Sequence, residues 1–164
     1  MEQRYDLSGS LLHWYDYNKR ILPWRENKDP YRIWISEIML QQTRVEAVKP
    51  YFDRFMEVLP TVYDLAKVDD DRLMKLWEGL GYYNRARNLK AAAQTIVEEY
   101  GGQLPADYDK LLSLKGIGMY TAGAIGSIAF ELQVPAVDGN VLRVLTRLWG
   151  DDSDILKDKT KKAM

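Results

Sequence analysis

The stretch that most restricts the fold of this chain is LSLKGIGMYTAGA, residues 112–124. Gly116 and Gly118 stand two residues apart, between an apolar segment and a run of small residues that begins at Thr121. This order predicts two helices joined by a tight turn, because glycine adopts backbone angles that other residues rarely reach. Free N–H groups at the start of the second helix would favour a phosphate. A plain helical hairpin explains the spacing equally well, because a single Gly-x-Gly pair is a weak motif.

Helix signals recur along the rest of the chain. Asp29 before Pro30 is typical of a helix start, and Asp138 is a good N-cap for the helix expected over VLRVLTRLW. No segment alternates convincingly between polar and apolar residues as a strand would. The predicted fold class is therefore all-α, with about eight or nine helices.

Three further signals lie between residues 43 and 64. Thr43 with Glu46 has the spacing of a capping box, which predicts a helix start at Thr43. Pro50 lies inside the apolar pattern that follows, so we expect a kink or break there. Thr61 with Asp64 predicts the start of the next helix.

Composition and charge narrow the class of protein. The 164 residues include no cysteine, so disulfides and thiolate-held metal or iron–sulfur sites are excluded within the chain. There is no apolar run of ~18 residues and no secretory signal, so we expect an intracellular protein without a membrane partner. The net charge of −1 argues mildly against a dedicated nucleic-acid binder. The cluster of Arg85, Arg87 and Lys90 is more typical of a solvated face than of a binding patch.

Longer blocks around the glycine turn carry a family resemblance. LKGIGMYTAGA resembles the helix-hairpin-helix of the DNA glycosylase superfamily that includes endonuclease III. Three more blocks, which lie between about residues 10 and 150, are similar to the catalytic region of MutY-type adenine glycosylases: LPWRENKDPYRIWISEIMLQQTRVEAVKPYF, LWEGLGYYNRARNL and PAVDGNVLRVLTRLW. The resemblance implies a helix-hairpin-helix DNA glycosylase fold, with a six-helix domain and part of a second helical domain.

The resemblance also implies where the domains lie. Residues 1–22 form an N-terminal helix of the second domain, residues 23–136 form the six-helix domain with its hairpin at about 107–130, and residues 137–164 begin the second domain. Family members usually carry a [4Fe–4S] cluster on four cysteines, and a domain that reads 8-oxoguanine, past the point where this chain ends. We therefore expect no cofactor and no metal on this chain. The last segment, DILKDKTKKAM, reads like the start of a helix and favours a truncated chain over a lineage that lacks the cluster.

Glu37 is the candidate general acid. Its neighbours one turn away on the expected helix are Ile33, Trp34, Leu40 and Gln41, so the charged form of the carboxyl is disfavoured, which suits a proton donor. Taken alone, the residues favour an ordinary surface or capping glutamate. The resemblance implies that Glu37 protonates adenine as it leaves, because anionic adenine is a poor leaving group.

Asp138 is expected to cap its helix whatever else it does. The resemblance implies a second role, in which Asp138 faces the deoxyribose and stabilises or traps the cationic sugar. This parallels glycoside hydrolysis, where an acid and an anion flank the bond that breaks. Asn140, two residues further on, could orient Asp138, or be an ordinary polar residue of the first helical turn.

Tyr120 occupies a position where lyase relatives carry a lysine that attacks the sugar. Tyrosine cannot form a Schiff base, so the resemblance implies a hydrolytic, monofunctional glycosylase with Tyr120 hydrogen-bonding near Asp138. A buried tyrosine with one ordinary hydrogen bond is the simpler reading of the residue itself.

The target base must leave the stack to reach an acid, and a protein side chain must fill the gap. Gln41, Gln42 and Thr43 fall at the junction of two helices, and the resemblance implies that Gln42 enters the duplex. The residues implied around the flipped base are Trp24, Arg25 and Leu40, of which Trp24 and Leu40 also read as core. The other implied DNA contacts are Tyr82 and, in the hairpin, Lys115, Gly116, Gly118 and Thr121.

These features lead to one expected activity and two alternatives. The expected protein is a base-excision-repair enzyme that hydrolyses the N-glycosidic bond of adenine opposite 8-oxoguanine or guanine. Its partner is double-stranded DNA with a mismatch or an oxidised guanine. It would be monomeric when full length, and cytoplasmic with the nucleoid if bacterial. The alternatives are a glycosylase for thymine opposite guanine, and a helix-hairpin-helix module that holds DNA without catalysis.

Overall fold

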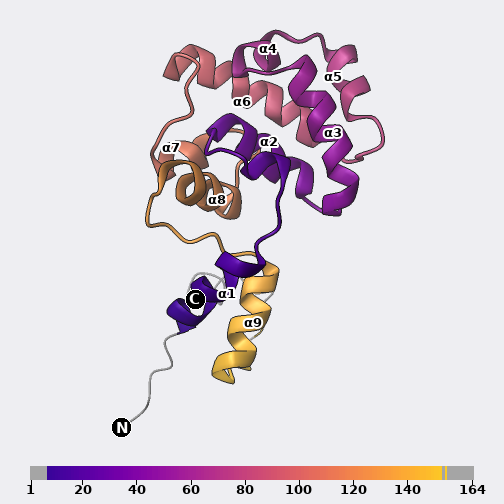
Figure 1. The fold of residues 1–164 in the computed structure, drawn as a ribbon. Helices are drawn as coiled ribbons and strands as arrows, with labels where there is room; N and C mark the ends of the chain where they lie inside the picture. Colours follow the sequence, from indigo (N-terminus) through magenta and orange to yellow (C-terminus); the bar gives the residue numbers. More distant parts are fainter. Residues whose placement is uncertain (1–6, 153, 155–164) are drawn as a thin grey trace.

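The computed structural model describes residues 7–152 and 154, and these residues form nine α-helices and one short 3-10 helix, with no strand (Figure 1). The helices in chain order are α1 (Leu7–Asn18), η1 (Pro23–Arg25), α2 (Pro30–Leu40), α3 (Val45–Val58), α4 (Val62–Lys67), α5 (Asp70–Trp77), α6 (Asn84–Tyr100), α7 (Tyr108–Ser113), α8 (Met119–Phe130) and α9 (Gly139–Trp149). The prediction of an all-α fold is confirmed. The helix start expected at the end of the chain falls on residues 155–164, outside the described part.

Helix α2 lies at the centre of a body formed by α2 to α8 (Figure 1). It packs against α3 and α8, and α4 packs against α6. All residues of α2 except Pro30, Arg32 and Leu40 are buried, so this helix is covered on nearly every side. The buried polar side chains of α2, Ser36 and Glu37, are therefore held by neighbours rather than by bulk water.

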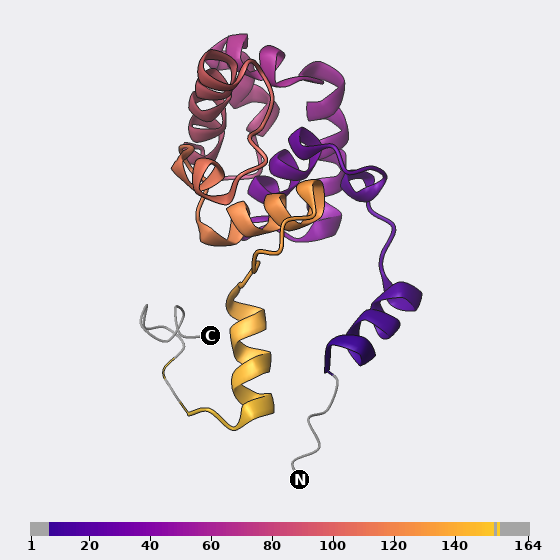
Figure 2. The same cartoon turned by 90° about the vertical axis from the view of Figure 1, so that its left-hand side faces the viewer.

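Helices α1 and α9 extend from the same side of this body (Figure 2). No residue of α1 is buried, and its apolar side chains Leu12 and Trp14 are exposed. On α9, Leu142 is buried, whereas Val144 and Leu148 are exposed. The apolar side chains of α9 are thus only partly covered within the described residues. The assignment of α1 and α9 to a second domain stays a prediction.

Most of the predicted helix starts agree with the structure. The Asp29 side chain accepts a hydrogen bond from the backbone N–H of Tyr31 at 2.9 Å. Thr61 and Asp64 form a reciprocal capping box at the start of α4. None of the helices in the described part of the chain is long and apolar enough to cross a bilayer.

Of two local expectations in the α2–α3 segment, the capping box is wrong, and the expectation of a kink or break at Pro50 is wrong as regards a break. Helix α3 begins one residue later than the capping box requires, at Val45, so its N-cap is Arg44 and Glu46 pairs with Lys49 instead of with Thr43. Just before this start, Gln42 adopts a left-handed backbone angle, φ +60°. Pro50 does not break α3, which is continuous from Val45 to Val58. A proline lacks only one backbone N–H, and the other hydrogen bonds of the helix keep it continuous.

Candidate active site

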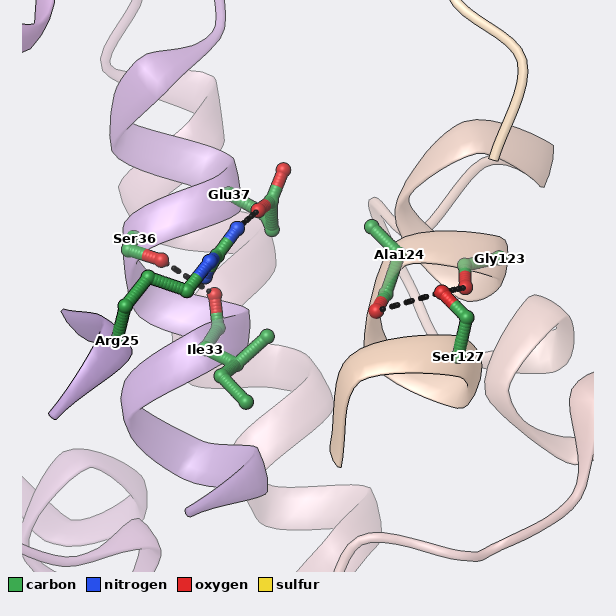
Figure 3. A network of polar contacts seen from close by, with 7 residues as sticks. All are labelled: Arg25, Ile33, Ser36, Glu37, Gly123, Ala124 and Ser127. Atoms are coloured by element: carbon green, nitrogen blue, oxygen red, sulfur yellow. Dashed lines mark hydrogen bonds and ion pairs between the residues drawn. The ribbon is translucent and has the colours of Figure 1, made fainter. Parts of the chain in front are cut away.

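The site begins with a carboxyl that is buried in the central helix. Glu37 is only 4% exposed, and its Oε1 accepts a hydrogen bond from Nη2 of Arg25 at 2.8 Å (Figure 3). Arg25 comes from η1, which is anchored by the buried ring of Trp24 packed edge-on against Phe52. A buried carboxylate without a partner would be costly, so the arginine supplies the charge and the donor that make this position tolerable.

Arg25 keeps a second donor unused. Its Nη1 is buried and has no hydrogen-bond partner among the described residues. Buried polar atoms are rarely left unpaired, so such an atom calls for an explanation. A ligand atom that accepts a hydrogen bond beside Glu37 would provide one.

Tyr120 approaches the same carboxyl from α8, which packs on α2. Burial, followed by the charge of Glu37, a hydrogen bond to Glu37 and the charge of Asp138, raises the pKa of Tyr120 to about 12. The carboxyl that acts most strongly on Tyr120 is therefore that of Glu37, with Asp138 as a further charged neighbour. The side chain of Tyr120 is still 38% exposed, so it forms part of the wall between Glu37 and solvent.

Asp138 stands at the start of α9 as its N-cap, as the sequence predicts. Oδ1 of Asp138 accepts a hydrogen bond from the backbone N–H of Val141 at 2.8 Å, and Oδ2 accepts one from Nδ2 of Asn140 at 3.0 Å. Both carboxylate oxygens are thus oriented by neighbours on the same helix. The charges of Glu37 on α2 and of Asp138 at the start of α9 both raise the pKa of Tyr120 on α8.

The path that brings Asp138 to this place depends on a glycine that the sequence analysis did not single out. A Cβ atom at Gly123 would lie 2.0 Å from the carbonyl oxygen of Pro135, so the segment before α9 crosses α8 directly over this residue. Across from Glu37, Ser127 donates a hydrogen bond to the Gly123 carbonyl at 2.7 Å (Figure 3). The small residues after Thr121 therefore allow the segment before α9 to cross α8 at close range, in addition to allowing close packing of a neighbouring helix.

The glycine hairpin has the predicted form, with α7 and α8 joined by residues 114–118. Gly116 has φ +81°, and a Cβ there would lie 2.7 Å from Cβ of Asn88, so both angle and space demand glycine. Gly118 is the N-cap of α8 with ordinary extended angles, no side-chain cap and open space around it. Thr121 is buried in the first turns of α8, whereas Lys115 is exposed.

Three of the predicted DNA-contact residues, one from the end of α2 and two from the hairpin, line one small cavity. Gln41, Lys115 and Gly116 line it together with Arg85 and Asn88. Gln42 and Tyr82 are exposed beside the ends of α2 and α6, whereas Leu40 and Thr43 are partly buried.

Arg85 is the residue that the sequence analysis misjudged. It does not belong to a solvated face, because its guanidinium donates hydrogen bonds to backbone carbonyls of α2 and of the loop before α6. Arg87 instead bonds Asn84, and Lys90 pairs with Asp70. Arg85, Arg87 and Lys90 therefore each bond different partners.

The residues present do not fit an iron–sulfur cluster. The sequence has no cysteine to supply thiolates. Within the described residues, no group of three or more His, Asp or Glu side chains is placed to hold a metal ion.

Relatives and solved structures are similar to this chain over most of its length. It is 48% identical over 149 residues to the adenine DNA glycosylase of Homo sapiens, covering 85% of this chain and 27% of the relative. It is 45% identical over 157 residues to the adenine DNA glycosylase of Buchnera aphidicola subsp. Acyrthosiphon pisum, covering 95% of this chain and 45% of the relative. The chain thus spans less than half of the length of these curated relatives.

Two solved structures share its fold. A thermostable thymine-DNA glycosylase superposes with a TM-score of 0.79 at 33% identity, covering 84% of this chain and 64% of that one. A non-covalent endonuclease III–DNA complex superposes with a TM-score of 0.77 at 27% identity, covering 98% and 77%. Residues 35–164 match the HhH-GPD superfamily of base excision DNA repair proteins. With these matches, and with its helical hairpin in place, the chain belongs to the HhH-GPD superfamily.

Proposed function

We propose that the protein to which this chain belongs is a DNA glycosylase that hydrolyses the N-glycosidic bond of adenine opposite 8-oxoguanine or guanine. The observation that carries the proposal is the buried Glu37, which accepts a hydrogen bond from Arg25 and whose charge acts on Tyr120. Asp138 lies close enough to influence Tyr120. The curated relatives named adenine DNA glycosylase support adenine as the base.

In this mechanism Glu37 gives its proton to a ring nitrogen of adenine, so that the base leaves neutral when the bond to the sugar breaks. The unpartnered Nη1 of Arg25 donates a hydrogen bond to the base beside Glu37. Positive charge develops on the sugar, and the carboxylate of Asp138 stabilises it. Water then adds to the sugar, and the proton it loses restores the acid, so the products are adenine and an abasic site.

Tyr120 makes the reaction hydrolytic in this proposal. Its phenol carries no amine that could form a Schiff base with the sugar. It also stays protonated through the physiological pH range, because its pKa is raised to about 12. Tyr120 therefore acts as a neutral donor to Glu37 and leaves the sugar to water.

The partner is double-stranded DNA that contains the mismatch. Gln42 and Tyr82 are exposed, and their side chains enter the duplex. The open hairpin at Gly118 presents N–H groups to a phosphate. The full-length protein acts as a monomer, in the cytoplasm with the nucleoid if bacterial. Any iron–sulfur cluster in it is held by cysteines outside this chain.

The test is release of free base by the full-length protein from duplexes with adenine opposite 8-oxoguanine, adenine opposite guanine, and thymine opposite guanine. We expect adenine from the first two duplexes and an intact strand in the third. Release of thymine alone would instead favour the thymine glycosylase, to which the structural similarity also extends. Tight binding without release from any duplex would favour the non-catalytic DNA-binding module.

A further inference from the structure

One guanidinium joins the end of the central helix to the loop before α6. Nη1 of Arg85 donates hydrogen bonds to the carbonyl oxygens of Ile38 at 2.8 Å, Met39 at 3.2 Å and Gln41 at 2.7 Å. Its Nη2 donates to the carbonyl oxygens of Leu80 at 3.0 Å and Gly81 at 3.2 Å. The last carbonyls of a helix lack partners within the helix and carry partial negative charge, so a cation is well placed there.

Arg85 thus bridges the end of α2 and the loop before α6. Two of the carbonyl groups that it bonds, those of Gln41 and Gly81, immediately precede residues with strained backbone angles. Gln42 follows Gln41 with φ +60°, and Tyr82 follows Gly81 with φ +48°. Side chains other than glycine rarely adopt such left-handed angles, and such residues persist only where their surroundings hold them. Only one other non-glycine residue in the described chain, Glu131, has a positive φ. Both residues held by the bridge are exposed, Tyr82 by 67%.

Arg85 is itself held in place by aromatic rings. Its guanidinium lies 5.4 Å from the ring centre of Trp77 and 5.7 Å from that of Tyr82. Nε1 of Trp77 donates a hydrogen bond to the Gly81 carbonyl at 3.1 Å. The buried indole and the arginine therefore both bond the loop before α6. The Arg85 guanidinium is thus held in a fixed position, and the ring of Tyr82 is one of the groups that hold it.

We infer that Arg85 is a positioning residue that holds Gln42 and Tyr82 together as a preformed wedge, which enters the DNA stack when the target base leaves. This inference rests on the proposed function. Arg85 need not touch DNA, since its donors point into the protein. Its effect is on the insertion step, because a wedge that is already in its strained form does not have to be ordered during insertion.

The variant that tests this is Arg85→Lys in the full-length protein. Lysine keeps the charge, but it has three donors on one atom and cannot span five carbonyls with a planar fork. The control is Arg54→Lys, because Arg54 also stacks on an aromatic ring, 4.8 Å from the centre of Tyr51, but is exposed and has no hydrogen bond to a carbonyl among the described residues. Melting temperatures show whether each variant is folded.

The decisive readout compares two substrates in single-turnover release of adenine. In one the adenine lies opposite 8-oxoguanine, and in the other opposite an abasic analogue, where it has no partner and leaves the stack more easily. For Arg85→Lys we expect a loss of about tenfold or more on the first substrate and at most about threefold on the second. Equal losses on both substrates would show a merely structural role and overturn the inference.

A double-mutant cycle asks whether Arg85 acts through the wedge. If it does, Arg85→Lys should add little to the loss caused by Gln42→Ala, because the side chain that it positions is already gone. Losses that multiply would overturn the inference.

A third readout does not depend on catalysis. Fluorescence of 2-aminopurine beside the target reports unstacking, and Arg85→Lys should reduce the rise seen on binding of the parent protein. If the parent protein releases base and the Arg85→Lys variant matches it in both fluorescence rise and release rate, only the role of Arg85 is refuted. A parent that gives neither rise nor release refutes the proposed function and the wedge together.

Discussion

Glu37 shows how a buried carboxyl can be tolerated. It lies on a helix whose residues are nearly all buried, and Arg25 donates a hydrogen bond to it at 2.8 Å. This donor, which comes from a different element, orients the carboxyl. The residue is thus fixed in direction before any substrate arrives.

The first prediction concerns the proton. Glu37→Gln keeps the shape and one hydrogen-bond acceptor for Arg25 but cannot donate a proton to the leaving base, so single-turnover release of adenine should fall by about 10²–10⁴. DNA affinity, measured by fluorescence anisotropy, should change little. Glu99→Gln, an exposed change on α6, is the control. A rate within tenfold of the parent would remove Glu37 from its role.

The second prediction concerns Tyr120. Replacing it with lysine places an amine beside Glu37 and Asp138, where it could attack the sugar and form a Schiff base. Borohydride should then trap a covalent adduct between Tyr120→Lys and DNA that the parent does not form. Efficient trapping by the parent itself would contradict the hydrolytic, monofunctional assignment.

Single residues differ in how well their environment could be predicted from the sequence. The apolar flank of Glu37 is visible in the helical spacing of Ile33, Trp34 and Leu40. The partners of Arg85 are backbone carbonyls of segments up to 47 residues away, and no side-chain pattern announces them. For this reason the sequence alone predicts that Arg85 lies on a solvated face.

At the scale of elements, the crossing of α8 by the segment before α9 sets where Asp138 stands. Gly123→Ala would place a methyl group against the backbone of Pro135, which cannot move aside as a side chain can. We expect the segment to shift by about 1 Å and adenine release to fall by ~10²-fold.

Gly126→Ala, three residues further along α8, is the matched control. Its added Cβ would meet side-chain atoms of Val134 at 3.1 Å and Leu132 at 3.4 Å, which can adjust. It should therefore cost far less activity, and both variants should melt as folded proteins. Similar losses for the two variants would show that α8 packing in general, and not the path to Asp138, sets the rate.

Helix starts could be predicted well where the cap is a local side chain. Asp29, Thr61 and Asp138 all bond the N–H groups that their spacing indicates. The box at Thr43 was wrong, and next to it Gln42 has a left-handed angle and a distant arginine bonds the carbonyl of Gln41, neither of which a local pattern contains.

For the whole molecule, the prediction concerns the uncovered apolar faces of α1 and α9. Trp14 on α1 and Leu148 and Trp149 on α9 are each more than half exposed. Apolar faces of this kind favour association when nothing covers them. We expect the 164-residue chain alone to self-associate in sedimentation, to bind DNA weakly with a steep dependence on salt, and to release adenine more slowly than the full-length protein.

The comparison uses one duplex, with adenine opposite 8-oxoguanine, at several protein concentrations. Equal affinities and equal single-turnover rates for the short and the full-length chains would contradict the prediction. The all-α class was predictable from periodicity, but the separation of α1 and α9 from the body was only implied by resemblance, because helical spacing does not reveal what a helix packs on.

Glu37 sits inside the body, whereas Asp138 heads a helix that extends away from it. The proposed acid and the proposed anion thus stand on different parts of the molecule (Figure 2). Under the proposed function, a body that has folded before α9 is seated would hold the acid without the anion, and would not release the base. The rate of base release then reports the completeness of assembly as much as the identity of the base.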